Sequence, residues 1–317
     1  MLQSPLSGRK IPVVDMGQLG LGRETEPSQE EWQRVAQELH QAFADIGFAY
    51  LINHGVPDDQ LNRVFELSAE LFSLEQETKN RFSRGAEDDH GYVAVDREKL
   101  DPELRYHELR EAYNVKNVDG RFPDEEVPCL RPAVASLIDS CMVLTNRLLT
   151  VLALSLGLAR DFFTSTHRMI CTGDNMSILR LLHYPPVPGD TPENTIRCGA
   201  HTDYGTFTLL FQDLLGGLQV RERGEAWIDA TPIPGAVVVN VGDLLQFWTA
   251  DQYLATEHRV VVPRDEVLLR SPRRSVVFFV HPDDQVSIRP LNGSSTYAPI
   301  TAAAHTIQRF KATYNYQ

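Results

Sequence analysis

Six short runs rich in β-branched and aromatic residues lie between residues 176 and 280, and they constrain the fold more than any other feature of the chain. Glycine and proline separate the runs, and no helical stretch is apparent between them. Parallel strands need long crossovers that are usually helical, so this pattern predicts an antiparallel sandwich or barrel. The runs are residues 176–184, 206–212, 218–222, 236–241, 258–262 and 275–280.

The remainder of the chain shows mainly helical periodicity, in which apolar residues recur every three to four positions. Ser28, with Glu31 three residues later, has the pattern of a helix N-cap. Helices are expected over residues 28–48, 58–72, 131–158 and 301–314, and strands over residues 11–15 and 47–52.

Two segments lack this periodicity. Residues 83–101 are charged and irregular and are expected to form a mobile loop, whereas 117–128 is acidic, carries Gly and Pro, and is expected to form a linker. The chain then divides into an N-terminal region (1–130), a long helix with its connector (131–172), a β core (173–285) and a C-terminal helix with its tail (286–317).

The charge balance argues against polyanionic partners. Thirty Lys and Arg against 43 Asp and Glu give a formal net charge of −13, so neither nucleic acid nor an anionic membrane is expected to bind. The longest strongly apolar stretch, 148–159, is shorter than the roughly 20 residues that span a membrane. No secretory signal is apparent, and the four cysteines are widely spaced, so we expect a soluble, cytoplasmic protein with reduced thiols.

A metal site is indicated by His201 and Asp203, two residues apart at the start of a β run. Alternate residues of a strand share a face, so an imidazole and a carboxylate can converge there on one ion. His258 begins a later run and completes the two-histidine, one-carboxylate set of non-haem iron(II) oxygenases. The pair alone is weak evidence for a metal site, since roughly 0.7 His-x-Asp matches are expected by chance in a chain of this length and composition. A second match, His281 and Asp283, lacks such a third residue and is expected to form a turn.

A carboxylate-binding pattern follows on the last β run. Arg273, Ser275, Val277 and Phe279 share one strand face. An inward-facing Arg and Ser can bind a carboxylate through a charge-assisted pair and a hydroxyl hydrogen bond. An exposed Arg is the alternative, and it is our interpretation of Arg274 on the opposite face.

With these motifs in order, the chain from residue 11 to about residue 311 resembles the isopenicillin N synthase-like family of iron(II)- and 2-oxoglutarate-dependent oxygenases. The motifs that carry the resemblance are IPVVD (11–15), GFAYLINHGV (47–56), LRLLHYPP (179–186), HTDYGTFTLL (201–210), GGLQV (216–220), PIPGAVVVNVGDLLQFWTADQYLATEHRVV (232–261) and RRSVVFF (273–279).

The resemblance implies a mostly β core with flanking helices, namely a double-stranded β-helix (jelly roll) with an N-terminal α/β extension and a C-terminal helix. It implies iron(II) as cofactor and 2-oxoglutarate as cosubstrate. The implied metal ligands are His201, Asp203 and His258, and the implied residues for the distal carboxylate of 2-oxoglutarate are Arg273, Ser275 and Tyr184. Plant members commonly carry Asn where this chain has Leu182, so that polar contact is missing here.

The implied activity is the oxidation, most often hydroxylation, of a small organic molecule by dioxygen, with release of succinate and CO2 and with ascorbate as a candidate reductant. We expect a monomer. The candidates for the substrate pocket are Tyr92, Arg105, Arg110, Phe207 and Phe279. The alternative is a solvated loop or scaffold role for the first three residues, and barrel core for the two phenylalanines.

Two other functions fit part of the pattern. Iron oxidases of the same family, such as isopenicillin N synthase and 1-aminocyclopropane-1-carboxylate oxidase, do not use 2-oxoglutarate and also carry Arg-x-Ser, where it binds a substrate carboxylate. A binding or sensor protein on an inactive jelly roll would be expected to lack part of the ligand set, and this sequence retains all three ligands and the Arg.

The charge balance predicts no meaningful affinity for DNA or RNA at physiological salt, because a chain of net charge −13 has few cations with which to displace counterions. Fluorescence anisotropy with a labelled duplex and a labelled single strand measures this. A salt-sensitive complex of sub-micromolar affinity would contradict the prediction.

Overall fold

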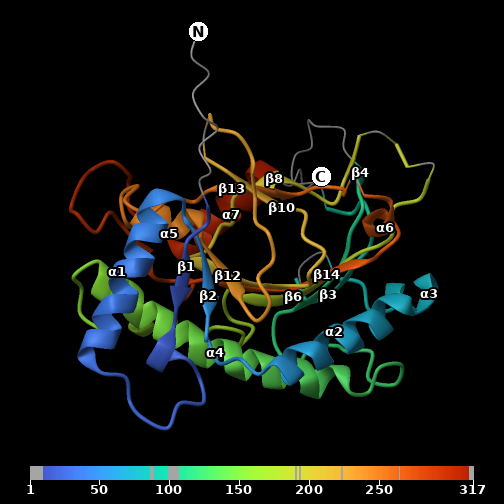
Figure 1. The fold of residues 1–317 in the computed structure, drawn as a ribbon, viewed down its shortest axis with the longest axis horizontal. Coiled ribbons are helices and arrows are strands. Elements are labelled where there is room, and N and C mark those ends of the chain that lie inside the picture. Colours follow the sequence, from blue (N-terminus) through green and yellow to red (C-terminus); the bar gives the residue numbers. More distant parts are fainter. Residues whose placement is uncertain are drawn as a thin grey trace.

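The computed structural model describes residues 10–85, 89–98, 107–189, 191–192, 194–222, 224–263 and 265–313, and two β-sheets form its centre (Figure 1). The large sheet has the order β1 (Val13–Asp15), β2 (Phe48–Ile52), β12 (Val237–Val241), β9 (Phe207–Gln212), β14 (Arg273–Val280), β6 (Ile178–Tyr184), β5 (Glu111–Val115) and β3 (Gly91–Val93). The small sheet has the order β11 (Ile228–Asp229), β10 (Leu218–Arg221), β13 (Glu257–Val260) and β8 (Cys198–His201). Within both sheets all neighbours are antiparallel except β1 and β2.

This arrangement is the double-stranded β-helix, so the predicted fold class is confirmed. Two further ladders are small: β4 (His107–Glu108) pairs with β7 (Thr195–Ile196), and β15 (Ser287–Ile288) pairs with β16 (Ile300–Thr301). The helices are α1 (Gln29–Asp45), α2 (Asp58–Ser73), α3 (Gln76–Asn80), α4 (Leu130–Ser155), α5 (Asp243–Trp248), α6 (Glu266–Leu269) and α7 (Ala302–Thr313), with 3-10 turns at Gly17–Leu19 and Thr164–Thr166.

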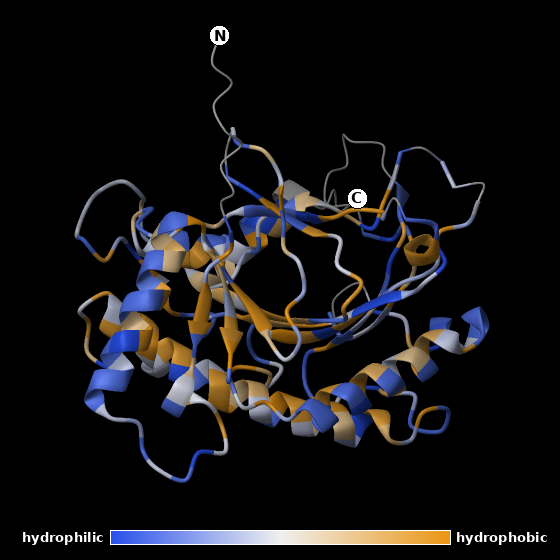
Figure 2. Ribbon diagram, in the orientation of Figure 1, coloured by the Kyte–Doolittle hydropathy of each residue, from blue (hydrophilic) through white to orange (hydrophobic). Residues whose placement is uncertain are grey.

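The three long helices α1, α2 and α4 cover the outer face of the large sheet. Helix α4 runs beneath the sheet and packs against both α1 and α2 (Figure 1). Hydrophobic residues concentrate in the strands and along α4, whereas α1 is largely hydrophilic in this view (Figure 2). Alternate strand residues such as Leu179 and Leu181 pack into this helix-covered core, and their neighbours Leu182 and Tyr184 pack on the inner side.

Helix α4 is long and apolar enough, by length and composition, to cross a membrane, which the 12-residue apolar stretch at 148–159 did not predict. More than half of its most apolar window is buried inside the fold. The core helix of a globular domain has these same properties.

The predicted N-terminal elements are present with shifted ends. Ser28 caps α1, its hydroxyl accepting a hydrogen bond of 3.2 Å from the backbone N–H of Glu31. The helix ends at Asp45, before the expected residue 48, because Gly47 adopts φ +70° and turns the chain into β2.

Three expectations about local structure were wrong. Residues 83–101 were expected to form a mobile loop, but in the described part of this range (83–85 and 89–98) β3 joins the large sheet and Glu98 is buried. Residues 86–88 and 99–101 lie outside the described residues. The short helices α5 and α6 lie in the segments between β runs, and no helix was expected in these segments. The linker candidate 117–128 packs Phe122 and Val127 into the core.

Gly47→Ala is expected to destabilise the fold by roughly 2–5 kcal/mol, the sum of a left-handed non-glycine residue and displaced backbone. A Cβ at residue 47 would lie 1.9 Å from the carbonyl oxygen of Leu254. The matched control is Gly157→Ala, which has φ +68° but no heavy atom within 4 Å of the new Cβ and should cost about 1–2 kcal/mol. Urea unfolding measures both, and equal costs would contradict the packing argument.

Candidate functional site

The space between the two sheets holds a cavity of about 1150 Å³, including the part open to solvent. Strand alternation decides which side chains reach it. The cavity-lining residues of β6 are Ile178, Arg180, Leu182 and Tyr184, and those of β14 are Arg273, Ser275, Val277 and Phe279. The small sheet contributes His201 and His258 to the opposite wall.

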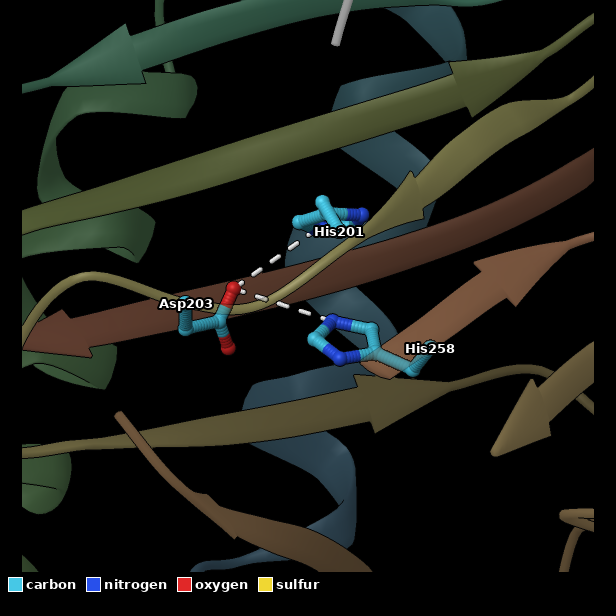
Figure 3. Close-up of side chains that lie close together, drawn as sticks. All are labelled: His201, Asp203 and His258. Carbon is cyan, nitrogen blue, oxygen red and sulfur yellow. Dashed lines mark ion pairs between the residues drawn. The ribbon is translucent and has the colours of Figure 1, made fainter. Parts of the chain in front are cut away.

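His201, Asp203 and His258 converge in this cavity (Figure 3). The Oδ1 atom of Asp203 lies 3.7 Å from Nε2 of each histidine, and the two imidazole centroids are 4.3 Å apart. Within the described ranges, this is the one group of three or more His, Cys, Asp or Glu whose ligand atoms lie close enough to hold one ion. Two imidazole nitrogens and one carboxylate oxygen suit iron(II) and leave further coordination positions open.

Hydrogen bonds to the rest of the protein occupy the outer atoms of these three side chains, so the atoms that converge stay available for a metal ion. Nδ1 of His201 lies 2.9 Å from the carbonyl oxygen of Gly199, and Nδ1 of His258 lies 3.2 Å from that of Thr256, so each Nδ1 donates and each Nε2 keeps its lone pair. The hydroxyl of Thr208 and the amide of Asn240 donate to Oδ2 of Asp203, at 2.6 and 2.7 Å. Oδ1 therefore remains free to bind a cation.

The ionisation of the cluster also fits a cation. Burial by itself would raise the pKa of Asp203, but His258, His201 and the hydrogen bonds from Asn240 and Thr208 outweigh it and lower the pKa. Burial, together with the neighbouring His201, lowers the pKa of His258 to about 4. At neutral pH the group therefore offers a carboxylate and a neutral imidazole, which are the protonation states that metal ligation needs.

His201 and Asp203 were predicted to converge from one face of a strand, but the structure brings them together in a different way. His201 is the last residue of β8, whereas Asp203 lies in the turn that follows, so the two do not share a strand face. The backbone N–H of Asp243, the first residue of α5, holds this turn by donating to the carbonyl oxygen of Asp203 at 2.7 Å. His258 is the cross-strand partner of His201, and a register shift follows it on β13.

A second charged centre lies at Arg273, which is almost fully buried. Its Nε donates to the carbonyl oxygen of Gly216 at 2.8 Å and its Nη2 to Oε1 of Gln212 at 2.9 Å, while Nη1 lies 3.5 Å from the hydroxyl of Ser275. No carboxylate of the described residues lies within ion-pair distance of this guanidinium. A buried cation without an anion is costly, so the geometry calls for an anionic ligand.

Tyr184 and Arg197 complete this centre. The guanidinium carbon of Arg273 lies 4.9 Å from the centroid of the Tyr184 ring. Burial raises the pKa of Tyr184, which keeps its hydroxyl protonated and able to donate. Sequence reasoning missed Arg197, a second buried arginine whose Nη2 donates to the carbonyl oxygen of Ser271 and whose pKa is lowered by burial and by the nearby Arg273. Its position four residues before His201 was a usable but weak signal.

The candidates for the substrate pocket divide into three groups. Arg110 and Phe279 line the cavity. Tyr92 and Phe207 do not, which corrects the prediction: strand alternation turns both into the helix-covered core, where the hydroxyl of Tyr92 bonds to Glu111. Arg105 lies outside the described residues. Cavity residues that the prediction missed include Arg180, Asn114 and Glu98.

The second His-x-Asp match behaves as expected. Asp283 accepts a hydrogen bond of 2.8 Å from the backbone N–H of Met169 through Oδ1. Neither Asp283 nor His281 belongs to the group of metal-ligating atoms found in the described part of the chain.

A double-stranded β-helix that gathers two imidazoles and one carboxylate beside an unpaired buried arginine defines a non-haem iron oxygenase. Models of two families match the chain: the 2OG-Fe(II) oxygenase superfamily over residues 175–282, and the non-haem dioxygenase in morphine synthesis N-terminal region over residues 11–133.

Individual proteins are also similar to this chain in sequence or structure over most of its length. A 2-oxoglutarate-Fe(II) type oxidoreductase of Metarhizium rileyi is 30% identical over 96% of this chain and 92% of its own length, and a homoarginine-6-hydroxylase of Arabidopsis thaliana is 31% identical over 90% and 88%. A full-length protein of Neurospora crassa, solved with alpha-KG and thymine, superposes with a TM-score of 0.84 at 32% identity and covers 96% of this chain and 97% of its own.

The chain therefore belongs to the 2OG-Fe(II) oxygenase superfamily. It is an iron(II)- and 2-oxoglutarate-dependent dioxygenase that hydroxylates a small molecule.

The variants His201→Ala, Asp203→Ala and His258→Ala are each expected to lose iron and turnover while keeping the fold, because each removes one ligand of three. Metal analysis after equilibrium dialysis measures iron per chain, and circular dichroism checks the fold. The control Asp283→Ala should retain iron. If all three ligand variants hold one iron with wild-type affinity, or if the control loses it, the assignment of the ligands is wrong.

Proposed function

We propose that in this chain His201, Asp203 and His258 hold Fe(II), and that Arg273, Ser275 and Tyr184 hold the distal carboxylate of 2-oxoglutarate. The observation that carries the proposal is the buried, unpaired guanidinium of Arg273 in the same cavity as the His–Asp–His cluster. A dicarboxylate fits this arrangement, since one end can reach the metal while the other pairs with Arg273.

When bound, Fe(II) activates dioxygen for the oxidative decarboxylation of 2-oxoglutarate and the hydroxylation of a C–H bond; one oxygen atom enters succinate and the other enters the product, with release of CO2. The protein residues provide the geometry. Thr208 and Asn240 fix the carboxylate of Asp203, and the carbonyl groups behind each histidine fix the ring orientation. Apolar side chains such as Leu210 and Val277 line the cavity between the two centres and limit the access of water.

We also propose a cytoplasmic monomer that binds neither nucleic acid nor membranes. Its net charge of −13 disfavours anionic partners, and all four cysteines are free thiols. The residues of the proposed metal site and of the proposed carboxylate site line one cavity of the chain. The relatives named for homoarginine hydroxylation and solved with thymine support a small polar substrate.

Arg273→Ala is expected to weaken 2-oxoglutarate binding by about 3–5 kcal/mol, or roughly two to four orders of magnitude, because it leaves a buried carboxylate uncompensated. Arg273→Lys should recover only part of the affinity, since an ammonium lacks the fork geometry of a guanidinium. Oxygen uptake against 2-oxoglutarate concentration measures this, with anaerobic calorimetry as a direct binding readout.

The matched control is Arg274→Ala, on the opposite face of β14, which should leave the 2-oxoglutarate affinity unchanged. Full-rate oxygen consumption by the wild type with substrate but without any 2-oxo acid would instead favour the oxidase alternative, in which Arg273 binds a substrate carboxylate.

A further inference from the structure

The C-terminal helix α7 contacts the turn that carries the proposed metal ligand Asp203. Nη2 of Arg309 donates to the hydroxyl oxygen of Thr202 at 3.1 Å, and the guanidinium carbon lies 5.4 Å from the centroid of the Tyr204 ring. The next residue of the helix, Phe310, lies edge-on to the same ring at a centroid distance of 5.4 Å. Side chains of α7 therefore contact the residue on each side of Asp203 in the sequence.

The same arginine also reaches α5, the helix that holds this turn. Nε of Arg309 lies 2.6 Å from Oδ2 of Asp243, the first residue of α5. The backbone N–H of Asp243 donates to the carbonyl oxygen of Asp203 at 2.7 Å. The next N–H, that of Leu244, donates to the carbonyl oxygen of Tyr204 at 3.2 Å. One guanidinium group thus joins α7 both to α5 and to the turn.

Asp203 depends on such contacts more than the other two proposed ligands do. His201 and His258 are cross-strand partners, so the ladder between β8 and β13 sets their positions. Asp203 follows β8 and lies outside the strands. Thr208 and Asn240 orient its carboxylate, but its backbone is positioned by the tertiary contacts of the turn. A shift of the turn would therefore move Oδ1 relative to the two imidazoles.

The first half of α7 is anchored without Arg309. Ala302 and Thr306 are almost fully buried, and the ring of His305 packs against that of Phe247 at a centroid distance of 5.8 Å. The side chain of Arg309 is 39% exposed, so it adds little to the burial of the helix. Loss of its guanidinium is therefore expected to release the turn without detaching α7.

The ion pair between Arg309 and Asp243 is also partly open to solvent, and such pairs add little to folding stability. Its contribution is geometric, because one rigid guanidinium fixes the turn and α5 relative to each other. Residues that orient a metal ligand directly often change metal affinity by ten- to a hundredfold. Arg309 acts on the turn rather than on the carboxylate, so its effect should be smaller.

We propose that Arg309 is a positioning residue for Asp203, and that the packing of α7 against the turn is coupled to metal binding. The guanidinium keeps the turn and α5 in the arrangement in which Oδ1 of Asp203 faces the imidazoles of His201 and His258. Because coupling is reciprocal, a bound metal ion fixes the turn and strengthens its contacts with α7. The inference rests on the proposed function, since it takes these three residues as the ligands of Fe(II).

The Fe(II) affinity of the full chain, measured anaerobically by competition with a chromophoric chelator, tests the role of Arg309. Arg309→Met removes the guanidinium and keeps an unbranched side chain that favours helix. It is expected to weaken Fe(II) binding about threefold to thirtyfold. Charge alone predicts the opposite sign, because loss of a cation near the site would favour Fe(II).

Two further variants serve as rescue and control. Arg309→Lys should recover part of the Fe(II) affinity, since an ammonium keeps the charge opposite Asp243 but lacks the fork geometry of a guanidinium. Lys311→Met removes an exposed cation from the same helix and should leave the affinity unchanged. Circular dichroism checks that each variant is folded.

Hydrogen exchange measured by mass spectrometry tests the coupling. Fe(II) should slow amide exchange in α7 of the wild type at least twofold, and it should do so less in Arg309→Met. If Arg309 only anchored the helix, exchange in the variant would be faster with and without Fe(II), and its Fe(II) affinity would be that of the wild type. Exchange in wild-type α7 that does not respond to Fe(II) would overturn the proposal.

The outcomes separate this inference from the proposed function. Wild-type protein that binds no Fe(II) contradicts the proposed function. Normal Fe(II) binding by the wild type, with binding by Arg309→Met that is tighter or less than threefold weaker, contradicts only the role of Arg309. If Arg309→Met does not fold, the exchange measurement on the wild type decides.

Discussion

The need to cover both faces of the large sheet governs this structure. Successive residues of β6, β9 and β14 point alternately to the two sides, and both sides are largely apolar, so neither can face water. Helices α1, α2 and α4 cover one side and the small sheet covers the other. The second covering is incomplete, because polar residues interrupt the inner face, and the space that remains between the sheets is the cavity. The site therefore results from the same alternation that builds the core.

Charge compensation organises that cavity into regions with different requirements. Asp203 accepts hydrogen bonds through one oxygen and faces the two imidazoles with the other. Arg273 is satisfied by neutral acceptors and meets no carboxylate in the described parts of the chain, while the group around Glu98 is balanced internally. Because a low-dielectric interior makes each imbalance costly, these differences specify where a cation and an anion can lie.

The sequence was sufficient for much of this description, for identifiable physical reasons. Spacing placed Arg273 and Ser275 on one strand face, because strand alternation is strict, and it placed Ser28 at the start of α1, because N-caps have few alternatives. Tyr184 followed from the family resemblance. The sequence could not tell which of two apolar faces borders the cavity, so Phe207 was assigned to the wrong side. It also treated the charges near Glu98 as solvent-exposed, since burial of an acidic residue depends on arginines far away in the chain. The turn that carries Asp203 depends on its tertiary contact with α5, which no local pattern reveals.

The pairing of the two imidazoles across β8 and β13 has a consequence for how metal is gained and lost. β8 is the edge strand of the small sheet and is hydrogen-bonded within that sheet to β13 alone. Edge strands open locally at a lower free energy than strands held on both sides, and hydrogen exchange reports such openings. An opening of β8 would carry His201 away from His258 while the large sheet and its helices stay intact. Metal exchange and global unfolding are then separate events with separate barriers. An ion that is bound by both strands also stabilises the pairing of β8 with β13 at the edge of the small sheet.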